Sequence, residues 1–188
     1  MITILDQNRV KFPDEDKIAI DHLFDQLSDA WDCGDGEAYA SLFLEDAVFV
    51  GVFGFRLKGR SVIQERHQDV FNSIFKYSRL ESMCGKQLQP LTNDVVLIHS
   101  DGDIYFPGEV AANSKPSGMR TLSVVKVDGT WKVASFQNTP TGSFRHIKFM
   151  FRFLRSRFYL FNQTWKKAYL RILEQKQQII NEWKNQPF

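Results

Sequence analysis

Cysteine and histidine are scarce in this chain. Its 188 residues include two cysteines, Cys33 and Cys84, which lie far apart and match no spacing of a metal site or a redox pair. The four histidines are scattered without an HxH or HxxxH pair: His22, His67, His99 and His146. We therefore predict no metal site and expect a reducing compartment, because nothing supports a disulfide between the two cysteines.

The chain also lacks the motifs and apolar runs that define several protein classes. It has no GxGxxG turn of the kind that binds nicotinamide or flavin nucleotides, so we predict no cofactor. No Ser-His-Asp or Cys-His arrangement stands out as a nucleophilic site. The N-terminus has no apolar signal core, and no stretch approaches the ~20 apolar residues of a membrane-spanning helix. These absences predict a soluble cytoplasmic protein, or one that is peripheral to a membrane.

Acidic and basic residues are unevenly distributed along the chain. Residues 1–140 hold 14 Lys and Arg against 20 Asp and Glu, whereas residues 141–188 hold 10 against 2. An acidic body with a basic tail predicts two functional units. We predict an N-terminal arm over residues 1–13, one domain over residues 14–140, and a basic, aromatic helical extension over residues 141–188.

Hydrophobic spacing in the first half of the domain predicts helices around one strand. A helix is expected from Pro13-Asp14 to Gly34, followed by a short one over Gly36–Leu44. The apolar run Ala47–Phe53 predicts a strand. A turn at Gly54–Gly59 and an amphipathic helix over Arg60–Phe75 complete this half.

The second half of the domain has the alternation and turn signals of β-structure. Asp128-Gly129 is a strong two-residue hairpin signal. The expected strands are Arg79–Gln89, Val95–Tyr105, Arg120–Val127 and Thr130–Gln137. Helices followed by strands predict an α+β fold, in which a strongly curved antiparallel sheet wraps around N-terminal helices and encloses a cone-shaped cavity.

Several short motifs occur along this domain in a recognisable order. They are Ala30-Trp31 with Gly34-Asp35, Asp46–Val50, Gly54–Arg60, His67 with Phe71 and Phe75, Trp131–Ala134, and Phe136–Thr139. In this order they resemble the nuclear transport factor 2-like superfamily, which has the cystatin-like cone fold, and within it the SnoaL-like and SgcJ/EcaC group. The resemblance covers about residues 14–140 and implies a homodimer formed through the sheet. It does not choose among the isomerases, cyclases, dehydratases, hydrolases, binding proteins and assembly domains of the superfamily.

Two residues are candidates for proton transfer. His67 lies four residues from both Ile63 and Phe71, so it falls on or near the apolar face of its helix, toward the predicted cavity. An imidazole there can act as an acid or base near neutral pH, or it can be a satisfied core histidine. Asp46 opens the first strand, where relatives often place a catalytic carboxylate; its alternative is a surface acid at the end of a helix.

Other side chains are candidates for ligand binding. Arg120 at the start of a strand can clamp a carboxylate through its planar fork, and His99 ends another strand. The alternative for both residues is a structural pairing with acidic neighbours. Gln137 and Asn138 are adjacent on a strand and point to opposite faces, so only one of them is expected in the cavity. The aromatic residues expected to line the cavity are Trp31, Phe49, Phe53, Phe71 and Phe75. The same spacing is also compatible with an ordinary hydrophobic core.

A heptad pattern of large apolar residues marks the basic tail. Its two seam positions hold Phe144, Phe151, Phe158, Trp165, Ile172 and Ile179, and Ile147, Leu154, Phe161 and Ala168. Four arginine and lysine residues lie on the opposite side: Arg145, Lys148, Arg152 and Arg155. This pattern fits a helix that packs on its own domain or across a dimer, an amphipathic anchor on an anionic membrane, or a ligand of a protein groove. Nucleic acid is disfavoured because the aromatic residues have core spacing rather than spacing for base stacking.

Two functions remain open at this point. In the first, the cavity binds a small, mostly apolar molecule with one or two oxygens, oriented by His67 and Arg120, and any chemistry is cofactor-free proton transfer of the isomerase, cyclase or dehydratase type. In the second, the protein is a non-enzymatic interaction or assembly module, and residues 144–184 dock to a membrane surface or to a protein partner.

Overall fold

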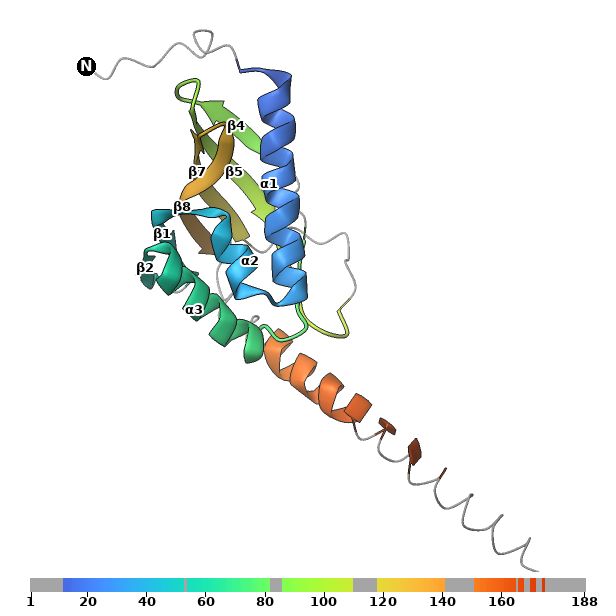
Figure 1. The fold of residues 1–188 in the computed structure, drawn as a ribbon. Coiled ribbons are helices and arrows are strands. Elements are labelled where there is room, and N and C mark those ends of the chain that lie inside the picture. Colours follow the sequence, from blue (N-terminus) through green and yellow to red (C-terminus); the bar gives the residue numbers. More distant parts are fainter. Residues whose placement is uncertain are drawn as a thin grey trace, which may run out of the picture.

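The computed structural model describes residues 12–52, 54–81, 86–109, 118–140 and 151–164, together with residues 166, 167, 170, 171 and 174. The elements of the domain follow in the order α1 (Asp14–Cys33), α2 (Gly36–Ser41), β1 (Phe43–Val50), β2 (Arg56–Lys58), α3 (Arg60–Asn72), β3 (Arg79–Leu80), β4 (Gln87–Pro90), β5 (Val95–Gly102), β6 (Ile104–Tyr105), β7 (Gly118–Val127) and β8 (Thr130–Pro140). Figure 1 shows helices gathered against one side of a curved sheet, and a C-terminal helix that extends away from both. The predicted α+β class is confirmed.

Helix α1 begins and ends where the sequence predicts. Pro13 precedes its first turn, and three acidic residues lie at the positive end of the helix dipole. Gly34 ends the helix at φ 68°, a left-handed conformation that glycine adopts without a steric penalty, and its N–H donates to Trp31 O over 2.9 Å. The side chain of Asp35 then accepts from Ala38 N at 2.9 Å and starts α2.

The main sheet has six strands in the order β2-β1-β8-β7-β5-β4. Its neighbours pair antiparallel except for β1 and β8, which run parallel and join the first strand of the domain to the last. Asp128 and Gly129, at φ 50° and 76°, form the tight turn between β7 and β8, as the sequence predicts. A second sheet of two strands, β3 and β6, lies beside it.

Several predicted boundaries move because strand pairing extends into regions expected as helix or turn. The second helix ends at Ser41, since Phe43 already pairs with Val133 of β8. The expected turn over residues 54–59 contains β2, which pairs with the end of β1. Helix α3 ends at Asn72 instead of Phe75.

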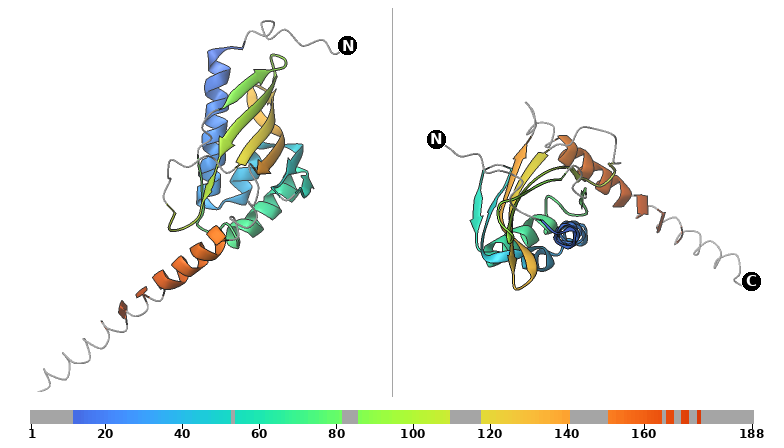
Figure 2. Two further views of the ribbon diagram at one scale, coloured as in Figure 1. Left: turned by 180° about the vertical axis from the view of Figure 1, so that it is seen from behind. Right: turned by 90° about the horizontal axis from the view of Figure 1, so that it is seen from above.

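The concave face of the sheet is closed by α1, which is seen end-on inside the curve of the sheet when the molecule is viewed from above (Figure 2, right). Residues Ile20, Phe24 and Leu27 of α1 are fully buried, as are Ile98, Leu122 and Val133 of the sheet. A polar clamp fixes this packing at one end: Asp16, 5% exposed, accepts from Trp131 Nε1 at 2.9 Å and from Lys126 Nζ at 2.7 Å. The hydrogen bond from Lys126 lowers the pKa of Asp16 below its ordinary value.

The C-terminal helix is continuous over residues 151–164. It is attached near its first turn, where Arg152 forms ion pairs with Asp103 and Glu109 at 3.0 and 2.8 Å. Gly108, at φ 83°, allows this close approach, because a Cβ there would lie 2.9 Å from the ring of Tyr159. In the part of the chain that the structure describes, no helix combines the length and apolar character needed to cross a membrane.

The Asp16 clamp generates a stability prediction. Replacing Asp16 with Ala should lower the free energy of unfolding by about 1–3 kcal/mol, because the buried Trp131 Nε1 loses its acceptor. Asp16→Asn keeps an acceptor for Trp131 and should cost less. Urea unfolding measures both, with Asp14→Ala as the control, since Asp14 forms a solvent-exposed ion pair with Lys17. Equal losses in Asp16→Ala and Asp14→Ala would contradict a structural role for the clamp.

Candidate functional site

A cavity of about 370 Å³ lies between the concave face of the sheet and the helices. Its walls come from α1, α2 and α3, from β1, β7 and β8, and from Arg152 at the start of the C-terminal helix. The volume is near the lower end of the range for small-molecule sites, which favours a small ligand.

Aromatic rings form most of the cavity wall. Phe49 and Phe136 stack at 4.8 Å between ring centroids, and Trp31 meets Phe75 at 5.1 Å. Trp31 Nε1 donates to Ser78 Oγ at 3.0 Å, so the polar atom of this ring is satisfied inside the protein. The wall therefore presents mainly apolar surface to the cavity.

His67 of α3 is held in an aromatic cage at the cavity. Its ring stacks on Tyr39 at 4.5 Å and meets the edge of Phe49 at 4.8 Å. Nδ1 lies 2.8 Å from Ile63 O, and because a carbonyl oxygen can only accept, Nδ1 carries the proton. Nε2 then keeps its lone pair for a ligand. Burial lowers the pKa of His67 to about 4, so the ring is neutral at pH 7.

Arg120 of β7 is the most deeply buried of the charged groups that line the cavity. Its side chain is buried, with 3% exposed, and Nη1 has no hydrogen-bond partner among the described residues. The guanidinium lies directly against Gly102, where a Cβ would clash with Nη1, so a larger residue at this position of β5 would force the guanidinium to move. Burial lowers the pKa of Arg120 from its ordinary value, but an arginine remains charged in a protein. A buried donor without a partner is uncommon in folded proteins and calls for an explanation.

The strand register places Arg120 in a polar row across the concave face. Ser100 on β5 pairs with Arg120, and Arg120 pairs with Asn138 on β8. A register shift in β8, opposite Ser123 and Val124, changes which side chains face inward. Before the shift Trp131 and Val133 are buried, and after it Phe136 and Asn138 line the cavity while Gln137 is exposed.

Tyr39 of α2 lies between these polar groups. It is 2% exposed, stacks on His67 and lines the cavity. Burial raises the pKa of Tyr39 above its ordinary value, and the positive charge of Arg120 acts against this shift. Tyr39 therefore contacts His67 by ring stacking and interacts electrostatically with Arg120.

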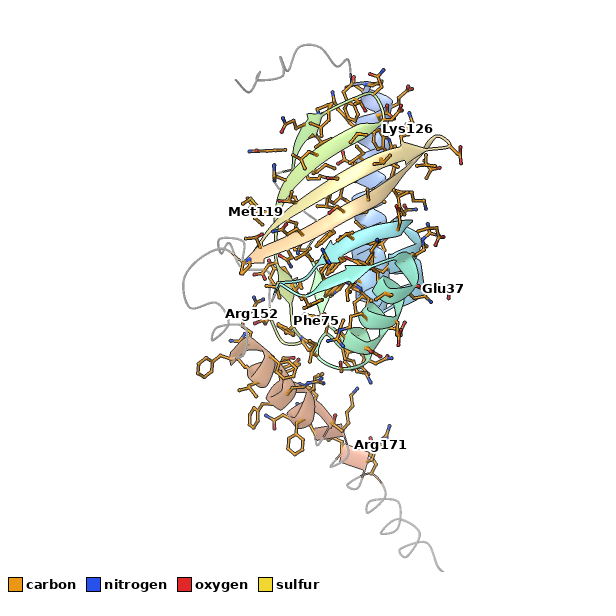
Figure 3. The ribbon with its side chains drawn as sticks, turned by 90° about the vertical axis from the view of Figure 1, so that its left-hand side faces the viewer. Glu37, Phe75, Met119, Lys126, Arg152 and Arg171 are labelled. Carbon is orange, nitrogen blue, oxygen red and sulfur yellow. The ribbon has the colours of Figure 1, made fainter. Side chains whose placement is uncertain are left out.

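The rim of the cavity is tied to the C-terminal helix. Arg152 donates from Nη1 to Asp103 Oδ1 at 3.0 Å and from Nη2 to Glu109 Oε2 at 2.8 Å. Burial would raise the pKa of Glu109, but hydrogen bonds from Arg152 outweigh it and hold the pKa below its ordinary value. The side chain of Arg152 also lies over the ring of Phe106, 5.7 Å from its centroid, and Phe106 stacks with Phe75. Figure 3 shows Arg152 at the end of the helix that adjoins the domain.

The structure brings together six of the residues selected from the sequence: Trp31, Phe49, His67, Phe75, Arg120 and Asn138. Phe71 packs behind this wall, against Trp31 at 5.0 Å. Asp46 is exposed on β1 and does not line the cavity, because it falls on the outward phase of the strand before Ala47 turns inward. Phe53 lies outside the described residues.

His99 and Gln137 point to the convex face of the sheet. His99 is half-buried on β5, and its Nδ1 lies 3.2 Å from Thr121 Oγ1 across the strand pair. Its neighbours on β5, Ile98 and Ser100, are both buried, so alternation along the strand directs His99 away from the cavity. The site described below therefore includes neither His99 nor Gln137.

Sequence reasoning missed Tyr39, Asp103 and Arg152 as cavity residues. Tyr39 lies on a six-residue helix too short for a periodic signal, and Arg152 reaches the cavity from outside the domain. The one available signal for Arg152 was its place on the polar side of the heptad pattern. Within the described ranges, no three His, Cys, Asp or Glu side chains gather to hold a metal ion.

The geometry agrees with known structures of one fold. No family profile matches the chain, and no curated protein matches it significantly. A cystatin-like domain from Nostoc punctiforme is similar over 88% of this chain and 99% of its own, at 23% identity and a TM-score of 0.61. A protein from Novosphingobium aromaticivorans, provisionally described as a scytalone dehydratase, is similar over 68% of this chain and 85% of its own, at 19% identity and a TM-score of 0.58.

A third neighbour is a provisionally described dehydratase of the NTF2-like family from Streptomyces avermitilis. It is similar over 70% of this chain and 99% of its own, at 18% identity and a TM-score of 0.58. These likenesses show that the domain has the cystatin-like fold that the sequence motifs indicate. At sequence identities this low, the likenesses show a shared fold and do not show a shared function.

The buried imidazole generates a pH prediction. In the unfolded chain His67 binds a proton below about pH 6.5, whereas in the folded protein it does so only near pH 4, so protons favour the unfolded state between these values. This contribution to stability is complete above pH 6.5 and is lost as the pH falls toward 4. Between about pH 7 and about pH 4.5, the wild type should lose roughly 2–3 kcal/mol more than His67→Phe, which cannot titrate.

Urea unfolding of both proteins at the two pH values measures this difference. The carboxylates that also titrate in this range are common to both proteins, so their contributions cancel. Parallel loss of stability in the two proteins would show that His67 is not held neutral by its cage.

Proposed function

We propose that the cavity binds a small, mostly apolar molecule whose carboxylate, or comparable acceptor oxygen, pairs with Arg120. One observation carries the proposal: a guanidinium that is 3% exposed in an apolar cavity has an Nη1 without a partner among the described residues. Leaving a buried donor unsatisfied is costly, and a charged hydrogen bond from a ligand would remove that cost. An arginine fork suits a carboxylate because two parallel N–H groups meet two oxygens.

The residues of the cavity wall indicate the chemistry of the rest of the ligand. Its apolar body would lie against Trp31, Phe49 and Phe136, where flat or branched hydrocarbon groups gain contact area. A hydroxyl or N–H group on the ligand would donate to His67 Nε2, the nitrogen left with a lone pair. Asn138, in the same cross-strand row as Arg120, would offer an amide beside the bound oxygen.

A cofactor-free reaction is the second candidate, and the pairing of a fixed cation with a neutral imidazole favours it. Arg120 would stabilise negative charge on a carbonyl oxygen while His67 Nε2 accepts a proton from the adjacent carbon, as an isomerisation or dehydration requires. Provisionally described dehydratases occur among proteins with this fold. A pKa of about 4 makes His67 a weak base, so the substrate proton would have to be acidic. Binding by Arg120 does not depend on this chemistry.

Native mass spectrometry of the freshly purified protein, with a denaturing control, is the first test. A releasable mass of a few hundred daltons would identify a ligand retained by the cavity. The same spectra report the number of subunits, for which the resemblance implies a homodimer. A panel of aromatic and medium-chain carboxylates, each paired with its methyl ester, then tests recognition of the charged group by saturation-transfer NMR. The proposal fails if no carboxylate in the panel binds better than its ester.

Replacing Arg120 with Met should separate binding from stability. The preference for carboxylates over their esters should fall by about tenfold or more, because a charged hydrogen bond is lost. The free energy of unfolding of the ligand-free protein should stay the same or rise, since a buried cation is replaced by a side chain of similar size. The matched control is Arg56→Met on the exposed strand β2, which should change neither quantity. A carboxylate preference that survives in Arg120→Met would remove Arg120 from the site.

A further inference from the structure

The C-terminal helix presents two different faces. One face meets the domain: Arg152 binds Asp103 and Glu109, Ser156 is 4% exposed, and Tyr159 packs against Gly108. These residues are four and three positions apart, so they lie on one side of the helix. The helix is thus fixed to the domain by its polar side.

The opposite face carries an apolar stripe, which consists of Phe151, Leu154 and Phe158. These side chains are 68%, 56% and 66% exposed, and they recur at the three- and four-residue spacing of one helix face. Phe161, the next residue in the series, is 57% exposed. Figure 3 shows ring side chains projecting from this helix on the side away from the domain. Among the described residues, those at the heptad seam are therefore more than half exposed, and contiguous exposed apolar surface of this kind marks an interaction site.

Charge around the stripe is of one sign. Residues 143–173 contain eight Lys and Arg and no Asp or Glu. Arg155 lies beside the stripe with its side chain 70% exposed, although it also pairs with Glu109 at 3.3 Å. The exposed Lys166 and Lys167 lie one to two turns beyond the stripe. An apolar stripe with basic flanks is the composition of a helix that lies in the interface of an anionic membrane.

A second copy of the helix is a poorer occupant of the stripe. Two helices that pair through a heptad seam are oriented by opposite charges beside it, and this segment has no acidic residue to offer before Glu174. Self-pairing would bring the basic flanks of two copies together. We propose that the stripe docks on a lipid surface that bears anionic headgroups, with the helix lying parallel to it and the domain held by Arg152 on the solvent side.

Vesicle co-sedimentation of the full chain tests this proposal. The probes are phosphatidylcholine vesicles with about 30% phosphatidylserine, and vesicles of phosphatidylcholine alone, at low and physiological salt. The wild-type protein should sediment with the anionic vesicles at least about tenfold more strongly than with neutral ones, and salt should weaken the binding. The double variant Phe151→Glu/Phe158→Glu should lose this binding by at least about tenfold.

The matched control is Ile18→Glu/Val127→Glu, which adds the same charge at apolar residues exposed elsewhere, 58% and 42% respectively. It should bind vesicles nearly as the wild type does, and circular dichroism and thermal unfolding verify that both variants keep the fold. The proposal is overturned if the wild type does not bind anionic vesicles at low salt, or if both variants lose binding equally. A third outcome also overturns it: the wild type does not bind vesicles, light scattering shows that it is a dimer, and only the Phe151→Glu/Phe158→Glu variant is a monomer. The stripe would then be the contact with a second copy.

Discussion

The arrangement of the cavity and the C-terminal helix depends on one carboxylate between two arginines. Asp103, 8% exposed, forms an ion pair with Arg152 at 3.0 Å and acts electrostatically on the buried Arg120. A cation in an apolar interior is tolerated only when negative charge or strong acceptors lie near it, and Asp103 supplies part of that compensation. Because Arg152 shares Asp103 and also binds Glu109, the position of the C-terminal helix and the charge balance of the cavity are coupled. The C-terminal helix belongs to the basic tail that the composition distinguishes from the domain, and through Arg152 it nevertheless contributes to the cavity wall.

The second governing feature is the aromatic cage. Rings around His67 exclude water, and this burial makes the imidazole neutral at pH 7 while Arg120 remains charged. The cavity consequently holds a buried positive charge at Arg120 and a neutral imidazole at His67 within a mainly apolar wall, with Asp103 and Arg152 at its rim. Such a site discriminates by charge and shape more than by many hydrogen bonds, which agrees with its modest volume. The cystatin-like fold supplies the scaffold, but the identity of the lining side chains decides what is bound, because unrelated functions occupy the same fold.

The proposed membrane docking and the proposed ligand binding would use separate surfaces of the same molecule. The apolar stripe uses the outer face of the C-terminal helix, whereas Arg152 closes the rim of the cavity from the inner face. Each proposal stands on its own residues, so either one can fail without the other. Together they would describe a domain that meets apolar molecules at a lipid surface, where such molecules are most concentrated.

The sequence by itself determined the α+β class, the bounds of α1, the Asp128-Gly129 hairpin and the inward placement of His67, because these depend on local periodicity and turn chemistry. It could not choose between Gln137 and Asn138, since a register shift in β8, set by pairing with β7, reverses the phase of the strand after Val133. The sequence also did not show that Asp46 and His99 point away from the cavity, or that Tyr39 and Arg152 line it. Those outcomes follow from contacts between elements far apart in the chain, and only the tertiary structure decided which face of each element is covered.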